Sequence, residues 1–258
     1  MPNNIHPSAV IDAKAVLGDN VTVKAFAVVE SDVVIGSNTV IDAGAQVLRY
    51  SSIGNTCHIF PYAVIGGISQ DLKYRDCCSF VKIGDNNTIR EFVTVNRGTD
   101  QDSSTVIGSN NHIMAYSHIA HDCVIGDNNI FANCATLGGH VVVGSHAVIG
   151  GLAAVHQFCR VGDMAIIGGC SKVVQDIPPY SMCDGHPAAV RGLNLVGLRR
   201  SGFTQKQIGL LKQAYKLAFF EDHPFDKAVE LIRSSVEASS EVDKLVVFLE
   251  HTKRGIAR

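Results

Sequence analysis

A branched aliphatic residue recurs at every sixth position through most of the chain as far as Val173. The series runs without interruption from Ile5 to Ile65, resumes from Ile83 to Val95, and continues from Ile107 to Val173. Phe131 is the only member of these three runs that is not Val, Ile or Leu. A repeat of fixed period indicates that each unit buries its apolar side by stacking on its neighbours. We therefore expect a regular array of coils.

The repeating unit has a second marker. In the first run, the residue four places after each aliphatic is small or β-branched, and units such as Ile35-Gly36-Ser37-Asn38 place Gly directly after the aliphatic. This pattern resembles the hexapeptide repeat of left-handed parallel β-helices, in which three hexads form one coil of a triangular prism. An amphipathic β-sandwich would instead show a period of two and irregular turns. The repeat thus predicts a left-handed β-helix, with coils about 4.8 Å apart.

Two gaps interrupt the series. The expected positions hold Asp71 and Cys77 in the first gap and Gln101 in the second. Because these residues do not fit an apolar interior, we expect loops near 67–82 and 97–106 that leave the prism. Such loops either carry binding groups or are tolerated excursions on the surface.

The period changes after Pro178-Pro179. Residues 204–207 read Thr-Gln-Lys-Gln, which is typical of a capping box at the start of a helix. Apolar residues at helical spacing follow, and further helices are expected near Asp226–Ile232 and Glu241–Leu249. The predicted organisation is a β-helix domain over residues 1–189 and a small helical domain over residues 190–258.

No Asp, Glu, Lys or Arg occurs between Asn128 and Cys159. By length alone this run matches a membrane span, but neutral polar residues such as His140 interrupt it, and we expect no integral membrane segment. Its inward positions would fill the prism, and its outer faces would pack against neighbouring subunits and line a cleft. This predicts a homotrimer with active sites between adjacent prisms.

The composition excludes some partners. The net charge is −2, only 18% of the residues are charged, and no basic block is present, so we expect no nucleic-acid partner. The N-terminus shows no secretory signal, and the eight cysteines include no C-x-x-C pair that would indicate structural zinc. We expect free thiols and a cytoplasmic protein.

Three histidines fall within two positions of one another on successive coils. They are His121, His140 and His156, and His118 lies on the same coil as His121. We expect the three to stack along one edge, separated by about 5 Å plus side-chain reach. Such a column is a hydrogen-bonded structural row, a metal site, or the location of a general base. The gamma-class carbonic anhydrases bind a metal through histidines on this fold, so a hydratase of that type is the alternative function.

Longer motifs favour one family. The chain contains the strings His118-Ile119-Ala120-His121-Asp122-Cys123, Val155-His156-Gln157-Phe158 and Gln70-Asp71-Leu72-Lys73-Tyr74. Together they resemble the motifs of the UDP-N-acetylglucosamine O-acyltransferases, and the resemblance extends over nearly the whole chain. It implies transfer of a 3-hydroxyacyl chain from acyl carrier protein to the 3-position of UDP-N-acetylglucosamine in lipid A biosynthesis. It implies no cofactor and no metal.

The resemblance also implies roles for individual residues. His121 would be the general base for the acceptor, and Asp122 would hold and polarise its imidazole. Gly139 lies one coil after His121, where its N–H would stabilise the oxyanion of the tetrahedral intermediate. Gly169 lies on the stretch where the family measures acyl length. The remaining substrate contacts implied are Gln70, Asp71, Lys73, His118, His140, His156, Gln157, Asn194 and Arg200.

Three positions depart from the family pattern. Many relatives carry His, Glu and Arg where this chain has Asn96, Val196 and Ser201. These changes would suit a different acceptor, for instance a 3-amino sugar acylated on nitrogen. The N-acyltransferase of the later lipid A step shares the fold but adds an N-terminal uridine-binding domain. The repeat here starts at Ile5, which leaves no room for that domain.

Overall fold

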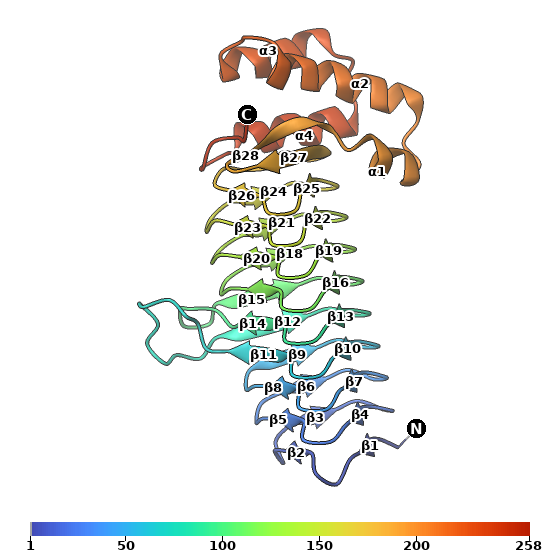
Figure 1. Ribbon diagram of the computed structural model, residues 1–258, viewed down its shortest axis with the longest axis vertical. Coiled ribbons are helices and arrows are strands. Elements are labelled where there is room, and N and C mark those ends of the chain that lie inside the picture. The colour runs from blue at the N-terminus through green and yellow to red at the C-terminus, as the bar shows by residue number, and fades with distance from the viewer. Residues whose placement is uncertain (1) are drawn as a thin grey trace.

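A computed structural model describes residues 2–258, which form a tall stack of coils with helices at its C-terminal end (Figure 1). Each full coil adds one strand to each of three sheets, and these sheets are the sides of a prism. Strands from successive coils pair in parallel, so the predicted β-helix is confirmed.

The three sheets are named A, B and C. Sheet A contains β1 (Asn4–Ile5), β4 (Thr22–Val23), β7 (Val40–Ile41), β10 (His58–Ile59), β13 (Thr88–Ile89), β16 (His112–Ile113), β19 (Ile130–Phe131), β22 (Val148–Ile149), β25 (Ile166–Ile167) and the antiparallel hairpin of β27 (Ser181–Gly185) and β28 (Ala188–Leu193). Sheet B contains β2 (Val10–Ile11), β5 (Val28–Val29), β8 (Gln46–Val47), β11 (Val64–Gly67), β14 (Thr94–Asn96), β17 (His118–Ile119), β20 (Thr136–Leu137), β23 (Ala154–Val155) and β26 (Lys172–Val173). Sheet C contains β3 (Val16–Leu17), β6 (Val34–Ile35), β9 (Ser51–Ile53), β12 (Phe80–Ile83), β15 (Ser104–Ile107), β18 (Val124–Ile125), β21 (Val142–Val143) and β24 (Arg160–Val161).

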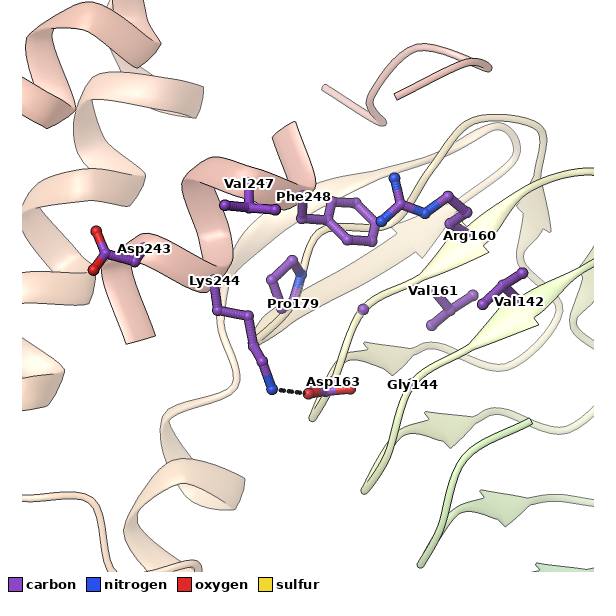
Figure 2. A pocket seen from close by; sticks show the side chains of 11 residues that line it. Val142, Gly144, Arg160, Val161, Asp163, Pro179, Asp243, Lys244, Val247 and Phe248 are labelled. Atoms are coloured by element: carbon purple, nitrogen blue, oxygen red, sulfur yellow. Dashed lines mark hydrogen bonds and ion pairs between the residues drawn. The ribbon is translucent and has the colours of Figure 1, made fainter. Parts of the chain in front are cut away.

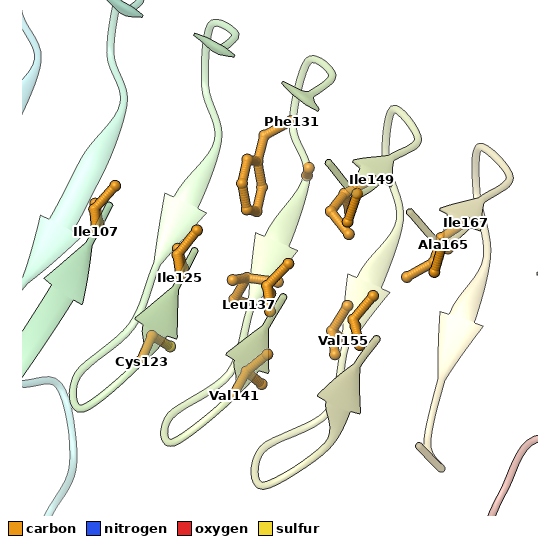
Figure 3. Close-up of a cluster of buried hydrophobic side chains, with 14 of the residues drawn as sticks. Ile107, Cys123, Ile125, Phe131, Leu137, Val141, Ile149, Val155, Ala165 and Ile167 are labelled. Atoms are coloured by element: carbon orange, nitrogen blue, oxygen red, sulfur yellow. The ribbon is translucent and has the colours of Figure 1, made fainter. Parts of the chain in front are cut away.

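The aliphatic residues of the repeat form columns inside the prism. In sheet A, Phe131 pairs with Ile149, and Ile149 pairs with Ile167. All three are buried, and Figure 3 shows them stacked from coil to coil. Removing such a side chain from water contributes about 1.5–3 kcal/mol relative to exposure. Burial of the repeat therefore holds the coils in one register.

The turns between the sheets make three corners, each with a residue of positive φ. At the B–C corner these residues include Asp122 and His140, both with φ of 58°. Such values are uncommon outside Gly, and here the repeating coil geometry imposes them. The A–B corner carries exposed aromatic rings that stack in sequence, namely Tyr62, Phe92 and Tyr116. The C–A corner carries mainly asparagines, such as Asn128.

Both predicted loops leave the prism at the B–C corner. The first lies between β11 and β12 and is the long projection seen in Figure 1, and the second lies between β14 and β15. Each joins a strand of sheet B to a strand of sheet C. The two interruptions of the repeat are thus brought to one edge of the molecule.

Helices follow the hairpin β27–β28. They are α1 (Leu195–Arg200), α2 (Gln205–Tyr215), the π-helix η1 (Lys216–Phe220), α3 (Phe225–Ser235) and α4 (Ser240–Glu250). The predicted capping box is present at α2, where Thr204 and Gln207 cap each other's backbone N–H groups. The hairpin and α1 were not anticipated from the sequence. The predicted domain boundary at residue 189 falls within β28 and stays a prediction.

All eight cysteines are free in the structure. Among residues 2–258, no helix combines the length and the apolar composition that crossing a bilayer requires.

Shortening an inward side chain is expected to cost far more stability than shortening its outward neighbour. Ile125→Ala should lower the free energy of unfolding by about 2–5 kcal/mol, because it leaves a cavity in the column. Val124→Ala on the same strand, at a side chain that is 45% exposed, should change it by less than about 1 kcal/mol. Urea unfolding of the two variants measures this difference, and equal losses would contradict the assigned register.

Candidate active site

The catalytic residues predicted from the sequence meet at the B–C corner. His121 and Asp122 lie in the turn that follows β17, and both loops emerge from the same corner on earlier coils. His121 is only 7% exposed. A buried imidazole at the base of two loops has a fixed orientation and limited contact with water.

His121 and Asp122 form a hydrogen-bonded pair. Nδ1 of His121 lies 2.9 Å from Oδ2 of Asp122. The same oxygen accepts the backbone N–H of Thr99 at 3.0 Å, and the backbone N–H of Asp122 is donated to Oγ1 of Thr105 at 2.8 Å. Asp122 is therefore fixed from its backbone and from its carboxylate.

The surroundings keep Asp122 ionised. Burial acts to raise its pKa, but hydrogen bonds from His121, Ser103 and the backbone of Thr99 outweigh that effect and hold the pKa below its ordinary value. An ionised carboxylate only accepts hydrogen bonds. Nδ1 of His121 therefore carries a proton, and in the neutral ring Nε2 presents a lone pair on the other side.

The first loop places a second carboxylate opposite Nε2. Oδ2 of Asp71 lies 3.8 Å from Nε2 of His121, too far for a direct hydrogen bond. The hydroxyl of Ser69 bonds that of Thr99 at 2.6 Å and accepts the backbone N–H of Asp71 at 3.2 Å. Thr99 thus connects the Asp71 loop to Asp122. The sequence indicated that both segments were loops, but it held no signal that Ser69 and Thr99 would meet.

Gly139 lies against the catalytic imidazole. A Cβ atom at this position would come within 2.4 Å of Cε1 and Nε2 of His121, so only glycine fits without displacing the ring. Gly139 is buried, and its backbone N–H has no acceptor among the described residues. A buried N–H without a partner is costly unless a ligand accepts from it. These contacts suit the predicted oxyanion site.

The histidine column differs in part from the prediction. The ring of His140 meets that of His121 edge-on, with centroids 5.1 Å apart, but its next neighbour is the ring of Phe158, stacked at 4.7 Å. His156 is exposed, and its Nδ1 contacts the backbone carbonyl oxygen of Gln157 and Nη2 of Arg254. The expected stack of three histidines is therefore wrong at its third member. One coil after His140 is residue 158, not 156, and a shift of two places changes the direction of the side chain.

His118 lies on the outer face of sheet B. Its Nδ1 is 2.7 Å from the hydroxyl of Thr94. Burial lowers the pKa of His118, and the nearby charge of His121 lowers it further. His118 is therefore suited to hydrogen bonding as a neutral side chain.

The other predicted contacts are spread over the molecule. Gln70, Lys73 and Gln157 are exposed. Gly169 follows β25 and lies at the A–B corner, away from the corner of His121. Asn194 is buried as the N-cap of α1, where its side chain accepts from Gly197 N and donates to the carbonyl of Met164.

Arg200 lies exposed in the last turn of α1 and forms no ion pair within the part of the chain that the structure describes. The side-chain amide of Asn194 already makes two hydrogen bonds within the chain, one donated and one accepted. One prism therefore does not bring Gly169, Asn194 or Arg200 to the pair of His121 and Asp122.

Three side chains also offer possible metal ligands. Atoms of His121, Asp122 and His140 all lie within 4.8 Å of one another. However, the shortest of these contacts is the hydrogen bond between His121 and Asp122, and Asp122 Oδ2 also accepts the N–H of Thr99. These hydrogen bonds would have to break before Nδ1 of His121 and Oδ2 of Asp122 could bind a cation. The arrangement as found is better suited to holding a proton on Nδ1.

Comparison with known proteins decides the family. A protein from Sulfurihydrogenibium sp. is 53% identical, with 98% of this chain and 94% of that protein aligned, and one from Thermodesulfovibrio yellowstonii is 45% identical over 99% and 100%. Both are named acyl-[acyl-carrier-protein]–UDP-N-acetylglucosamine O-acyltransferase. The chain belongs to the UDP-N-acetylglucosamine O-acyltransferase family.

Solved structures and family models agree with this membership. The UDP-N-acetylglucosamine acyltransferase from Campylobacter jejuni superimposes with a TM-score of 0.92 at 45% identity, covering 98% of this chain and 99% of that one. A model described as UDP N-acetylglucosamine O-acyltransferase domain 2 matches residues 176–257. A bacterial transferase hexapeptide model matches residues 14–49 and 104–139, and the second match includes His121 and Gly139.

Replacing Asp122 should remove a stabilisation that depends on pH. Because folding lowers its pKa, ionised Asp122 stabilises the fold at pH above its ordinary value of 3.8, and this contribution is lost as pH falls through the lowered value. The parent protein should therefore be more stable than Asp122→Asn near pH 7, and the difference should shrink below about pH 4. Urea unfolding across this range measures it. Asp19→Asn, at an exposed position, serves as the control, and a difference for Asp122→Asn that is constant with pH would contradict the assignment.

Proposed function

We propose that the protein transfers a 3-hydroxyacyl chain from acyl carrier protein to the 3-hydroxyl of UDP-N-acetylglucosamine, a step of lipid A biosynthesis. The observation that carries the proposal is the hydrogen-bonded pair of His121 and Asp122 beside the unpartnered N–H of Gly139. A base, a group that orients it and an oxyanion donor are the parts that acyl transfer needs. The names of the full-length relatives supply the two substrates.

His121 acts as the general base. Its Nδ1 proton stays hydrogen-bonded to Asp122, and Nε2 takes the proton of the acceptor hydroxyl as the oxygen attacks the thioester carbonyl. The carbonyl oxygen becomes negative in the tetrahedral intermediate and accepts the N–H of Gly139. Collapse of the intermediate breaks the carbon–sulfur bond. The imidazolium of His121 then returns its proton to the departing thiolate, which leaves as a thiol.

The acceptor sugar lies between His121 and Asp71. The gap of 3.8 Å between Nε2 and Oδ2 leaves both atoms free to bind sugar hydroxyls. Asp71, Lys73 and Gln70 on the first loop, with His118 and Gln157 on the prism, provide the polar contacts. The 3-hydroxyl acceptor follows from the O-acyltransferase family, and a product assay by mass spectrometry that also offers the 3-amino analogue tests this choice.

We infer a homotrimer with each active site between two prisms. The proposed substrate contacts lie on different corners of one chain: the His121 pair at B–C, Gly169 at A–B, and Asn194 beside Met164 at C–A. A neighbouring prism would bring Gly169 close to His121 of the first. The A–B corner suits such a contact because its stacked aromatic rings are exposed in the single chain.

Replacing the base should abolish transfer without unfolding the protein. His121→Ala is expected to lower kcat by roughly 100-fold to 10,000-fold, the usual contribution of general-base catalysis. The measurement is release of thiol from 3-hydroxyacyl carrier protein in the presence of UDP-N-acetylglucosamine. His146→Ala is the matched control, because it removes the same side chain from a turn of the prism but at an exposed position of the C–A corner.

Undiminished turnover by His121→Ala would exclude this mechanism.

Removal of metal ions distinguishes acyl transfer by His121 from a metal-dependent hydratase. We expect acyl transfer to persist after dialysis against EDTA. Activity that is lost on dialysis and restored by zinc or cobalt would favour the His121, Asp122 and His140 cluster as a metal site.

A charge placed among the stacked aromatic rings of the A–B corner should weaken the trimer. Tyr116, which stacks on Phe92 with ring centroids 5.0 Å apart, is 59% exposed in the single chain. Tyr116→Asp would bury an unpaired carboxylate at the proposed interface, and it is expected to shift sedimentation toward the mass of one chain. Asn110→Asp at the exposed C–A corner is the control. A monomeric parent, or equal masses for the two variants, would contradict the assembly.

A further inference from the structure

The first loop is attached to the rest of the molecule at one short segment. Within residues 2–258, the hydrogen bonds that connect residues 68–77 to the rest of the chain all end on Asn96, Arg97 or Thr99. Asn96 is the last residue of β14, and the other two begin the second loop. We call residues 96–99 the anchor segment. All four of its residues are buried, so it is a firm support for the loop.

Two side-chain contacts hold the turn that carries Asp71, one on each side of it. Before the turn, the hydroxyls of Ser69 and Thr99 bond at 2.6 Å. After the turn, Nη2 of Arg97 donates to the phenolic oxygen of Tyr74 at 2.8 Å. The anchor segment therefore fixes both ends of the turn.

The turn also has hydrogen bonds of its own. The backbone N–H of Lys73 is donated to Oδ1 of Asp71 at 2.8 Å, and that of Tyr74 to the carbonyl of Asp71 at 3.0 Å. A side-chain oxygen that accepts from the backbone two residues later is typical of Asp in turns. These local bonds determine the shape of the turn, but they do not determine where it lies on the prism.

Arg97 fastens the loop through a buried cation. It is 3% exposed and forms no ion pair within the described part of the chain. Its guanidinium lies 5.7 Å from the ring centroid of Tyr50 on the prism and 5.9 Å from that of Tyr74 on the loop. Aromatic faces attract a cation and offset part of the cost of burying it. Arg160 packs in the same way on Phe248, where α4 docks on the prism (Figure 2).

The anchor segment also touches the catalytic pair. The backbone N–H of Thr99 is donated to Oδ2 of Asp122 at 3.0 Å. A Cβ atom on Gly98 would lie 2.8 Å from Oδ1 of Asp122, so a glycine lets the backbone pass close to that carboxylate. Thr99 thus turns its hydroxyl to the loop and its N–H to Asp122. Substitution of the side chain removes the first contact and keeps the second.

We propose that Arg97 and Thr99 are positioning residues, which hold the loop of Asp71 in place for the acceptor sugar. The inference rests on the proposed function, in which Asp71 and Lys73 contact UDP-N-acetylglucosamine beside His121. A loop that is already held need not be ordered when the sugar binds, and this increases affinity. Release of the loop should therefore weaken binding of the acceptor and leave the chemical step intact.

The test removes one hydroxyl at a time from the two contacts. Thr99→Val and Tyr74→Phe are each expected to raise the KM for UDP-N-acetylglucosamine by roughly threefold to tenfold, as expected for loss of one hydrogen bond. The kcat and the KM for the acyl donor should change by less than about twofold. Thr99→Ser keeps the hydroxyl and should retain the KM of the parent protein. Steady-state kinetics with each substrate varied in turn measures these constants.

A matched control removes a hydroxyl that has a structural contact only. Ser109 accepts the backbone N–H of Asp85 at 3.0 Å on the C–A corner, away from the loops, so Ser109→Ala should leave both KM values unchanged. A second comparison uses Asp71→Asn as the parent. In that background Tyr74→Phe should raise the KM for the acceptor by a smaller factor, because part of the contact that it positions is already lost.

An unchanged KM for UDP-N-acetylglucosamine in both Thr99→Val and Tyr74→Phe would overturn the proposal. Equal effects on kcat and on both KM values would do the same, because they would indicate a general loss of structure. So would an undiminished effect of Tyr74→Phe in the Asp71→Asn background. Tyr74 is only partly buried, so its variant decides the question even if Thr99→Val disturbs Asp122.

A binding measurement separates this inference from the proposed function. If the parent protein transfers no acyl chain, the proposed function fails. The dissociation constant of UDP-N-acetylglucosamine, measured by calorimetry, then still tests the anchor segment. Weaker binding by both variants than by the parent would support it, and equal binding, or no binding by the parent, would overturn it.

Discussion

Stacking of aliphatic side chains along the inside of the prism controls the rest of this structure. Each coil places its inward residues directly on those of the coil before, as in the column of Phe131, Ile149 and Ile167. A slip of one residue would turn apolar side chains outward and polar ones inward. The register is therefore strongly determined, and so is the position of every corner residue. Asp122 and His140 adopt a positive φ because the coil on either side leaves them no alternative.

The catalytic chemistry follows from that rigidity. Gly139 lies against the ring of His121 because the two occupy neighbouring positions on successive coils. Asp122 is held by Thr99 from one loop and by Thr105 from the adjacent coil. Ser69 joins the loop of Asp71 to the same Thr99. The position of Asp71 on the loop and the orientation of His121 thus depend on one hydrogen-bonded network. The rigid prism holds the base, and the two loops hold Asp71, Ser69 and Thr99 around it.

Sequence reasoning succeeded where a local rule was enough. The period of six predicted the β-helix, the interruptions at Asp71 and Gln101 predicted the loops, and the coil length placed Gly139 beside His121. It failed where direction or long-range contact mattered. His156 is close to the expected position along the turn, but Phe158 is the neighbour of His140. The sequence also held no signal that the amide of Asn194 would cap α1 and bond the carbonyl of Met164; its role toward substrate stays a prediction.

The sequence by itself determined the fold, the corner on which the base lies and the family, because a strict repeat converts position along the chain into position in space. Only the tertiary structure decided which polar groups meet. The bond between Ser69 and Thr99 and the bond from Arg160 to the carbonyl of His251 join segments far apart in the chain. No periodicity relates those segments. Their contacts arise from how the loops fold back on the corner and how α4 docks on the last coils, which depends on packing in three dimensions.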